Sequence, residues 1–127
     1  MLFLGVAHNG VKRIDVQSQK VLIIGAGAIG LLAASIAKAM GATTVMIADI
    51  NSQRLELAKE MGADITINCK EVDLYQEVMK LTNNDGVPRL VEASGASPLV
   101  NSCFKLLQKV HLLALILFFA FKNRLLS

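Results

Sequence analysis

Apolar and polar residues along the chain form blocks of two kinds. Short blocks that are nearly all apolar, or that alternate, predict strands over about residues 20–24, 43–48, 64–68 and 89–93. Longer blocks with apolar residues at helical spacing predict helices over about residues 3–13, 28–40, 53–61, 71–81 and 96–107. Strands and helices therefore alternate, and right-handed crossovers between them predict an α/β fold with a doubly wound parallel sheet.

Two helices carry finer signals at their beginnings. Ser52 lies just before the helix over residues 53–61, and we expect it to be the N-cap because a serine oxygen can accept from the first free N–H groups. In the helix over residues 71–81 we expect Val72 to face the core together with the other apolar side chains.

The last apolar block, residues 110–121, is nearly continuous and is followed by polar and basic residues. It is too short to cross about 30 Å of hydrocarbon as a helix, so a transmembrane segment is the alternative rather than the expectation. We expect a fifth buried strand over about His111–Leu117, and an irregular apolar tail beyond it.

The first predicted strand runs directly into a glycine-rich turn, with glycines at positions 25, 27 and 30 before the long helix. In this Gly-x-Gly-x-x-Gly spacing the first glycine suits a tight turn, the second leaves room for a pyrophosphate, and the third lets helix and strand approach. The free N–H groups at the helix start favour an anion. We therefore expect a Rossmann-type fold that binds a dinucleotide through Gly25, Gly27, Ala28, Ile29 and Gly30. The alternative is a turn that only packs helix on strand.

The second predicted strand is followed by Asp49, 19 residues beyond Gly30. This is the distance at which a carboxylate reaches the adenosine ribose of a dinucleotide. A 2′-phosphate at the same place would be repelled by about 4 kcal/mol, so we expect NAD to bind better than NADP by at least about tenfold. The alternative is that Asp49 is only a turn or helix-capping residue.

Composition limits the other possibilities. The chain has 127 residues, of which 54% are hydrophobic and 18% charged, so we expect one domain over residues 1–127. The net charge of +3 is spread along the chain, which argues against a nucleic-acid surface. Cys69 and Cys103 lack metal-ligand spacing and are expected to be core thiols. The N-terminus has no secretory signal pattern, so we expect a cytoplasmic protein that binds no membrane.

Three stretches of the chain together resemble one family. They are GVAHNGVKR at residues 5–13, KVLIIGAGAIGLLAASIAKAMGATTVMIADINSQRLELAKEMGAD at residues 20–64, and VEASGAS at residues 91–97. They are similar to the cofactor-binding half of the zinc-type medium-chain dehydrogenases, the family of alcohol, sorbitol and threonine dehydrogenases. The resemblance covers about residues 5–109, whereas residues 110–127 diverge from the family.

The resemblance implies NAD-dependent oxidation of a primary or secondary alcohol or a polyol, with hydride passing to the nicotinamide. It places Arg54 at the adenosine ribose and Ala93, Ser94 and Gly95 at the ribose groups of the cofactor. Arg54 could instead be a solvated helix residue paired with Glu56 or Asp49, and residues 93–95 could be no more than a tight turn. Relatives form homo-oligomers, so the resemblance also makes oligomerisation possible.

The family's zinc ligands, a cysteine and a His-Glu pair, lie in a catalytic domain that precedes the stretch at residues 5–13. The chain has no residues that match them, so we assign no catalytic or metal-binding residue and expect the chain alone to be inactive. We expect an incomplete domain, with an altered reading frame after Lys109 as one explanation. Two other hypotheses are a regulatory dinucleotide-sensing module, like those attached to potassium channels, and a non-functional remnant of a dehydrogenase gene.

Overall fold

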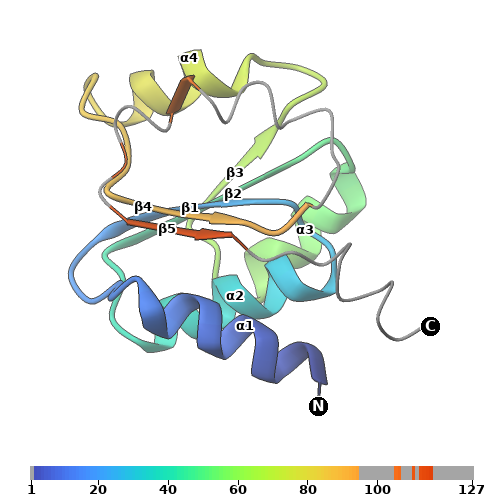
Figure 1. Ribbon diagram of the computed structural model, residues 1–127. Coiled ribbons are helices and arrows are strands. Elements are labelled where there is room, and N and C mark those ends of the chain that lie inside the picture. The colour runs from blue at the N-terminus through green and yellow to red at the C-terminus, as the bar shows by residue number, and fades with distance from the viewer. Residues whose placement is uncertain (1, 95–104, 107–109, 111, 116–127) are drawn as a thin grey trace.

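A computed structural model describes residues 2–94, 105–106, 110 and 112–115 of the chain. Helices and strands alternate along most of it, which confirms the predicted α/β class (Figure 1). In chain order the elements are α1 (Leu2–Arg13), β1 (Lys20–Ile24), α2 (Ala28–Ala39), β2 (Thr44–Asp49), α3 (Ser52–Glu60), β3 (Ile65–Asn68), α4 (Leu74–Leu81), β4 (Arg89–Glu92) and β5 (Leu112–Leu115).

The strands of the described part form one parallel sheet in the order β3-β2-β1-β4-β5. From β1 the chain first adds strands on one side, β2 and then β3, and afterwards on the other side, β4 and then β5. This reversal around β1 is the Rossmann-type arrangement, and it opens a crevice at the carboxyl ends of β1 and β4. Any ligand site of this fold is expected there.

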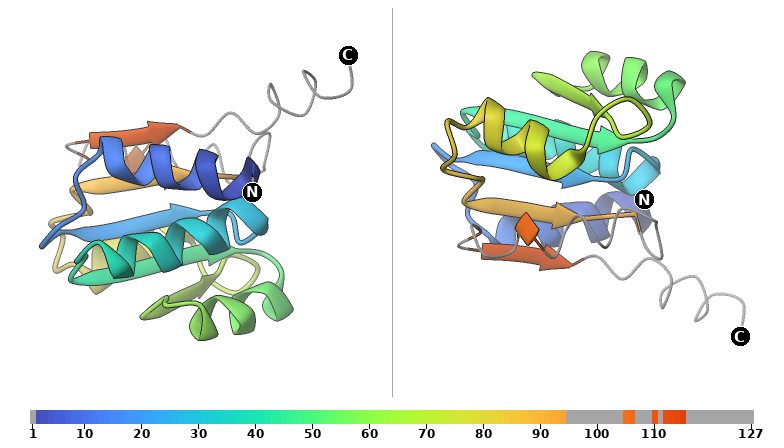
Figure 2. Two further views of the ribbon diagram at one scale, coloured as in Figure 1. Left: turned by 90° about the horizontal axis from the view of Figure 1, so that it is seen from below. Right: turned by 90° about the horizontal axis from the view of Figure 1, so that it is seen from above.

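Helices cover both faces of the sheet (Figure 2). One face packs against α1, α2 and α3 through a core that includes Val21 and Ile23 of β1. The other face packs against α4 through a core that includes Leu22 and Ile24 of the same strand. Successive side chains of a strand point to opposite faces, so a central strand buried on both sides must be apolar throughout.

Two helix beginnings differ from the sequence predictions. Helix α3 already includes Ser52, so the predicted serine cap is wrong. Asn51, in extended conformation, is the N-cap, and its side chain accepts from the Arg54 N–H at 3.0 Å. Helix α4 begins at Leu74, later than predicted, because Asp73 caps it. Val72 therefore precedes the helix and is exposed rather than directed inward.

The C-terminal predictions are only partly within the described residues. Strand β5, Leu112–Leu115, lies inside the predicted fifth strand and pairs in parallel with β4. Of the predicted helix over residues 96–107, only Lys105 and Leu106 are described, and both are helical. The predicted tail beyond Leu117 lies outside the described residues. Within the described part, no helix has the length and apolar character needed to cross a membrane.

Candidate functional site

The glycine-rich turn lies at the carboxyl end of β1, in contact with the exit of β4. Gly25 has a φ of +105°, which confirms the tight turn predicted for this glycine. A Cβ at Gly25 would lie 2.8 Å from both the Cα and the nitrogen of Ser94. The Gly25 N–H donates to the Ala48 carbonyl and the Ala93 N–H to the Ile24 carbonyl, each at 2.8 Å. The ends of β1, β2 and β4 are therefore locked together around the turn.

The other two glycines differ in what surrounds them. A Cβ at Gly27 would meet nothing within 4 Å, so the space outside this residue is open. A Cβ at Gly30 would lie 1.7 Å from the Gly25 carbonyl oxygen, so only glycine allows this helix to lie so close to the turn. Both observations agree with the roles that the spacing predicts, room for a ligand at Gly27 and close packing at Gly30.

Helix α2 begins at this open space. Its N-cap is Gly27, which offers no side chain to the first N–H groups, and its first turn has no acidic residue. The amides of Ala28 and Ile29 therefore have no side-chain cap among the described residues, and the first turn of the helix carries no negative charge of its own. The geometry is suited to holding a phosphate group by main-chain N–H groups.

Asp49 at the end of β2 is only 7% exposed, and its carboxylate faces the glycine turn. One carboxylate oxygen accepts from the Ala26 N–H at 2.6 Å. The other accepts from the N–H groups of Ile50 and Asn51 at 2.6 and 3.0 Å. Asp49 is thus a turn residue, as the alternative interpretation had it, and it also fixes the glycine turn. A carboxylate has about four acceptor positions, of which these three hydrogen bonds use three.

Arg54 lies exposed in the first turns of α3, next to the end of β2. The structure pairs Glu56 with Lys59 at 3.0 Å rather than with Arg54. The carboxylate of Asp49 is hydrogen-bonded to backbone N–H groups and not to Arg54. Among the described residues, the guanidinium of Arg54 therefore has no ion-pair partner and is accessible from solvent.

Glu92, the last residue of β4, lies next to the glycine turn and was not among the residues singled out from the sequence. It is 6% exposed. One carboxylate oxygen accepts from the N–H of Ser94 at 2.7 Å and from the Ser94 hydroxyl. The other, Oε2, is buried and has no hydrogen-bond partner among the described residues. The available signal was an acidic residue among the apolar residues Leu90, Val91 and Ala93, since ionised side chains are rarely buried without partners. Gly95, the last predicted site residue, lies outside the described residues.

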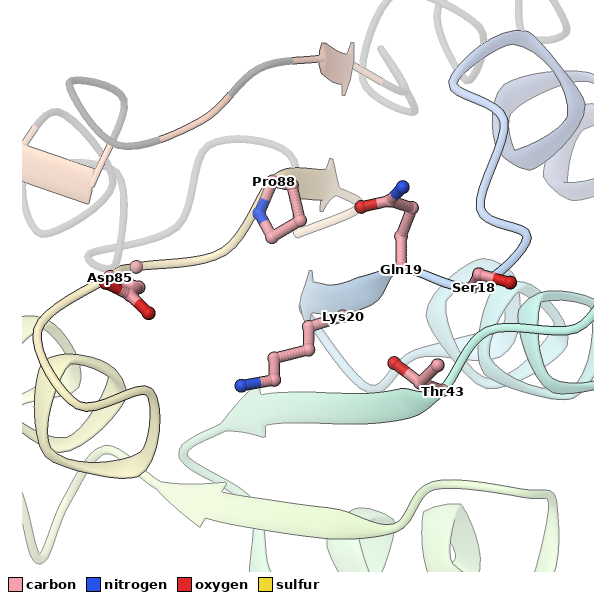
Figure 3. A pocket seen from close by; sticks show the side chains of 7 residues that line it. Ser18, Gln19, Lys20, Thr43, Asp85 and Pro88 are labelled. Carbon is pink, nitrogen blue, oxygen red and sulfur yellow. The ribbon is translucent and has the colours of Figure 1, made fainter.

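A pocket lies at the other end of the strands, where their amino ends meet. It is lined by residues at the amino ends of β1, β2 and β4, among them Lys20, Thr43 and Asp85 (Figure 3). The side chains that line it are exposed or half-buried. Thr82, a buried polar side chain near this pocket, is used within its own loop, where it donates to the Val78 carbonyl and accepts from the Gly86 N–H. The buried carboxylates Asp49 and Glu92 both lie at the carboxyl edge, so we place the candidate site there.

The described residues contain no group of three or more His, Cys, Asp or Glu side chains that could hold a metal ion. Cys69, half-buried against the core on the α4 side, agrees with its prediction as a core thiol. Burial, together with the charges of Asp49 and Asp73, raises the pKa of this thiol to about 11. Cys103 lies outside the described residues.

The fold and the carboxyl-edge turn define a Rossmann-type nucleotide-binding domain, and comparisons with known proteins agree. A family model described as zinc-binding dehydrogenase matches residues 28–116. An L-threonine 3-dehydrogenase from Pyrococcus horikoshii is 44% identical over 93 residues, which are 73% of this chain and 27% of that protein. The chain belongs to the zinc-type medium-chain dehydrogenases and corresponds to the NAD-binding part of that family, which confirms the resemblance seen in the sequence.

Solved structures support the same assignment. The alcohol dehydrogenase TADH from Thermus sp. ATN1 superposes with a TM-score of 0.78 at 28% identity, over 89% of this chain and 33% of that one. A zinc-binding dehydrogenase from Sinorhizobium meliloti 1021, bound to NADP, superposes with a TM-score of 0.72 at 29% identity, over 77% and 30%. The chain thus spans about a quarter to a third of the length of these relatives.

Proposed function

We propose that the chain binds NAD across the carboxyl edge of the sheet, as the cofactor-binding part of a zinc-type alcohol or polyol dehydrogenase. The observation that carries the proposal is the glycine turn. Open space at Gly27 lies beside the uncapped first turn of α2, while Gly30 keeps that helix against Gly25. A pyrophosphate fits this cradle without any basic side chain.

Each flank of the turn would take one half of the cofactor. The pyrophosphate would bind the amides of Ala28 and Ile29, and Asp49 with Arg54 would take the adenosine ribose on the β2 side. The sheet order β2-β1-β4 supports placing the nicotinamide half over β4, at Ala93 and Ser94. Gly95 is added to this proposal from the sequence alone. When bound, NAD supplies the acceptor for a hydride from the alcohol.

The described residues do not fit the family's zinc, because no three potential ligands lie together among them. No catalytic step is therefore assigned to this chain. Oxidation of an alcohol is proposed for the whole dehydrogenase to which this part of the fold belongs, and binding of the dinucleotide is proposed for the chain itself.

The charge of Asp49 leads us to propose NAD rather than NADP. A 2′-phosphate about 4 Å from this carboxylate would be repelled by about 4 kcal/mol at an effective dielectric constant of about 20. Arg54 lies exposed on the same side of the site, and its guanidinium can offset part of that repulsion. The net preference is for NAD by at least about tenfold.

Isothermal titration of the chain with NAD and with NADP tests the proposal. The informative variant is Arg54→Gln, because the Arg54 N–H that bonds Asn51 remains while the guanidinium is lost. We expect this variant to lose more affinity for NADP than for NAD. Arg13→Gln, which removes the same charge at the end of α1, is the matched control and is expected to bind like the unsubstituted chain. If the unsubstituted chain binds NADP more tightly than NAD, the assignment of Asp49 is wrong. If it binds neither cofactor, the proposal is refuted.

A further inference from the structure

The carboxylate of Glu92 is buried at the end of β4, beside the glycine turn. Leu90, two residues earlier on the same strand, belongs to the core between the sheet and α4, and Leu106 packs into the same core. Residues two apart on a strand share a face, so the Glu92 side chain begins on this apolar face. A carboxylate in such surroundings needs hydrogen bonds on both oxygens, yet Oε2 has none from the described residues.

The other oxygen of Glu92 fixes the exit of β4. Oε1 accepts from both the N–H and the hydroxyl of Ser94, so this one oxygen holds the backbone and the side chain of that residue. The backbone of that residue is what Gly25 touches, since a Cβ there would lie 2.8 Å from the nitrogen and the Cα of Ser94. Glu92 therefore contributes to the position of Ser94 relative to the glycine turn, together with the hydrogen bond from the Ala93 N–H to the Ile24 carbonyl.

We propose that Glu92 is a positioning residue for the half of the dinucleotide that extends over β4. The inference rests on the proposed function, because it assigns Glu92 to the same cofactor site. Asp49 and the adenosine half lie over β2, and β1 separates β2 from β4. Glu92 therefore acts on the nicotinamide half through Ser94, whereas Asp49 acts on the adenosine half.

The unpartnered oxygen distinguishes this role from a purely structural one. Replacing Glu92 with an apolar side chain removes a buried oxygen that has no partner but also leaves the two Ser94 donors without an acceptor, so the two effects on the free energy of unfolding offset one another. A positioning role thus predicts that Glu92→Leu loses affinity for NAD without losing thermal stability. A structural role predicts that both fall together.

The experiment compares three variants of the full chain. Glu92→Leu removes both oxygens, and Glu92→Gln keeps one carbonyl oxygen that can accept from Ser94. Glu60→Gln at the exposed end of α3 removes a carboxylate charge away from the turn and is the matched control. For each chain we would measure the melting temperature, the affinities for NAD and for AMP by titration, and the hydrogen-exchange rates of the Gly25 and Ser94 amides by NMR.

For Glu92→Leu we expect the NAD affinity to fall about tenfold, because Ser94 is no longer held in place, while AMP, which occupies only the adenosine side, binds as before. The Ser94 amide should exchange faster, the melting temperature should not fall, and Glu92→Gln should recover part of the NAD affinity.

Unchanged NAD binding by Glu92→Leu would overturn this inference and leave the proposed function intact. Parallel losses of NAD binding, AMP binding and melting temperature would also overturn it. If the unsubstituted chain binds no NAD, the proposed function fails, and this inference fails with it. Should Glu92→Leu not fold, Ser94→Ala, which removes only the hydroxyl donor to Oε1, must weaken NAD and not AMP.

Discussion

Replacing Gly27 or Gly30 with Ala should separate ligand binding from folding within a single turn. A methyl group at Gly27 would point into open space, whereas one at Gly30 would lie 1.7 Å from the Gly25 carbonyl oxygen and 2.8 Å from its carbonyl carbon. The two substitutions are chemically identical and only three positions apart. Their different outcomes are therefore determined by what surrounds each Cβ.

The magnitudes follow from these contacts. Gly27 has a φ of −75° and a ψ of −171°, which alanine adopts without strain, so Gly27→Ala should change the free energy of unfolding by less than about 1 kcal/mol. At Gly30 the clash is with backbone atoms that cannot rotate away, so α2 must move. Forced overpacking of this kind costs about 3 kcal/mol or more. For a chain of this size that corresponds to a fall in melting temperature of about 10 °C.

NAD affinity should distinguish the two variants as well, because Gly27→Ala is expected to weaken binding without destabilising the fold. The methyl group of Gly27→Ala occupies the space that we assign to the pyrophosphate, so NAD affinity should fall at least about tenfold in a fully folded chain. Calorimetric unfolding and NAD titration of the two variants would measure both effects. Unchanged NAD affinity in Gly27→Ala would refute the assignment of the pyrophosphate to this turn. An undiminished melting temperature in Gly30→Ala would contradict the close packing of α2.

Three further predictions concern ionisable groups. Asp49→Asn should lower the free energy of unfolding by about 1–3 kcal/mol, because the amide cannot accept both from Ala26 and from the N–H groups after β2; chemical denaturation measures it. Burial alone would raise the pKa of Asp64, but the hydrogen bond from Lys38, the hydrogen bond from the Val45 N–H and the charge of Lys38 lower it below its ordinary value. The ion pair of Asp64 with Lys38 therefore stabilises the fold above about pH 4 and is lost in stronger acid. Lys38→Met should therefore lower stability by less than about 1 kcal/mol at pH 7 and by nothing in strong acid, measured by urea unfolding across pH. Cys69, with its raised pKa, should react with iodoacetamide far more slowly in the native chain than in urea, as followed by mass spectrometry of its peptide.

Each of these predictions has a contrary result. An Asp49→Asn chain as stable as the original would show that the carboxylate does not fix the glycine turn. A Lys38→Met chain whose stability deficit persists unchanged in strong acid would show that packing, not charge, carries the effect. Equal alkylation rates for Cys69 in the native and unfolded chains would contradict the raised pKa that burial and the neighbouring carboxylates give this thiol.

The sequence predicted the strands and helices around β1 and β2 well because each has a local cause. Block length and periodicity distinguish a buried strand from an amphipathic helix, and the glycine spacing marks the turn between them. The cap of α3 was predicted one residue too late, because Asn51 and Ser52 are both good caps and adjacent. Only the backbone conformation decides between two such neighbours.

The polar contacts of the site could not be predicted in the same way. The hydrogen bond from Ala26 to Asp49 joins residues 23 positions apart, and it exists because β1 and β2 end side by side. The link from Glu92 through Ser94 to Gly25 depends on β4 lying on the other side of β1. Neither contact leaves a periodic signal, since both arise from the order of strands in the sheet.

The glycine turn is flanked by two buried carboxylates that act on main-chain groups. Asp49, from β2, holds the turn itself through the Ala26 N–H. Glu92, from β4, holds the neighbouring Ser94. Because backbone N–H groups from the start of α2 would bind the pyrophosphate, the centre of the site is indifferent to which dinucleotide enters. In the proposed binding mode, discrimination then comes from the flanks, where Asp49 lies beside the adenosine half and Glu92 acts on the other half through Ser94. The proposed selection of NAD on the β2 side and the proposed orientation of the nicotinamide on the β4 side can therefore be tested separately.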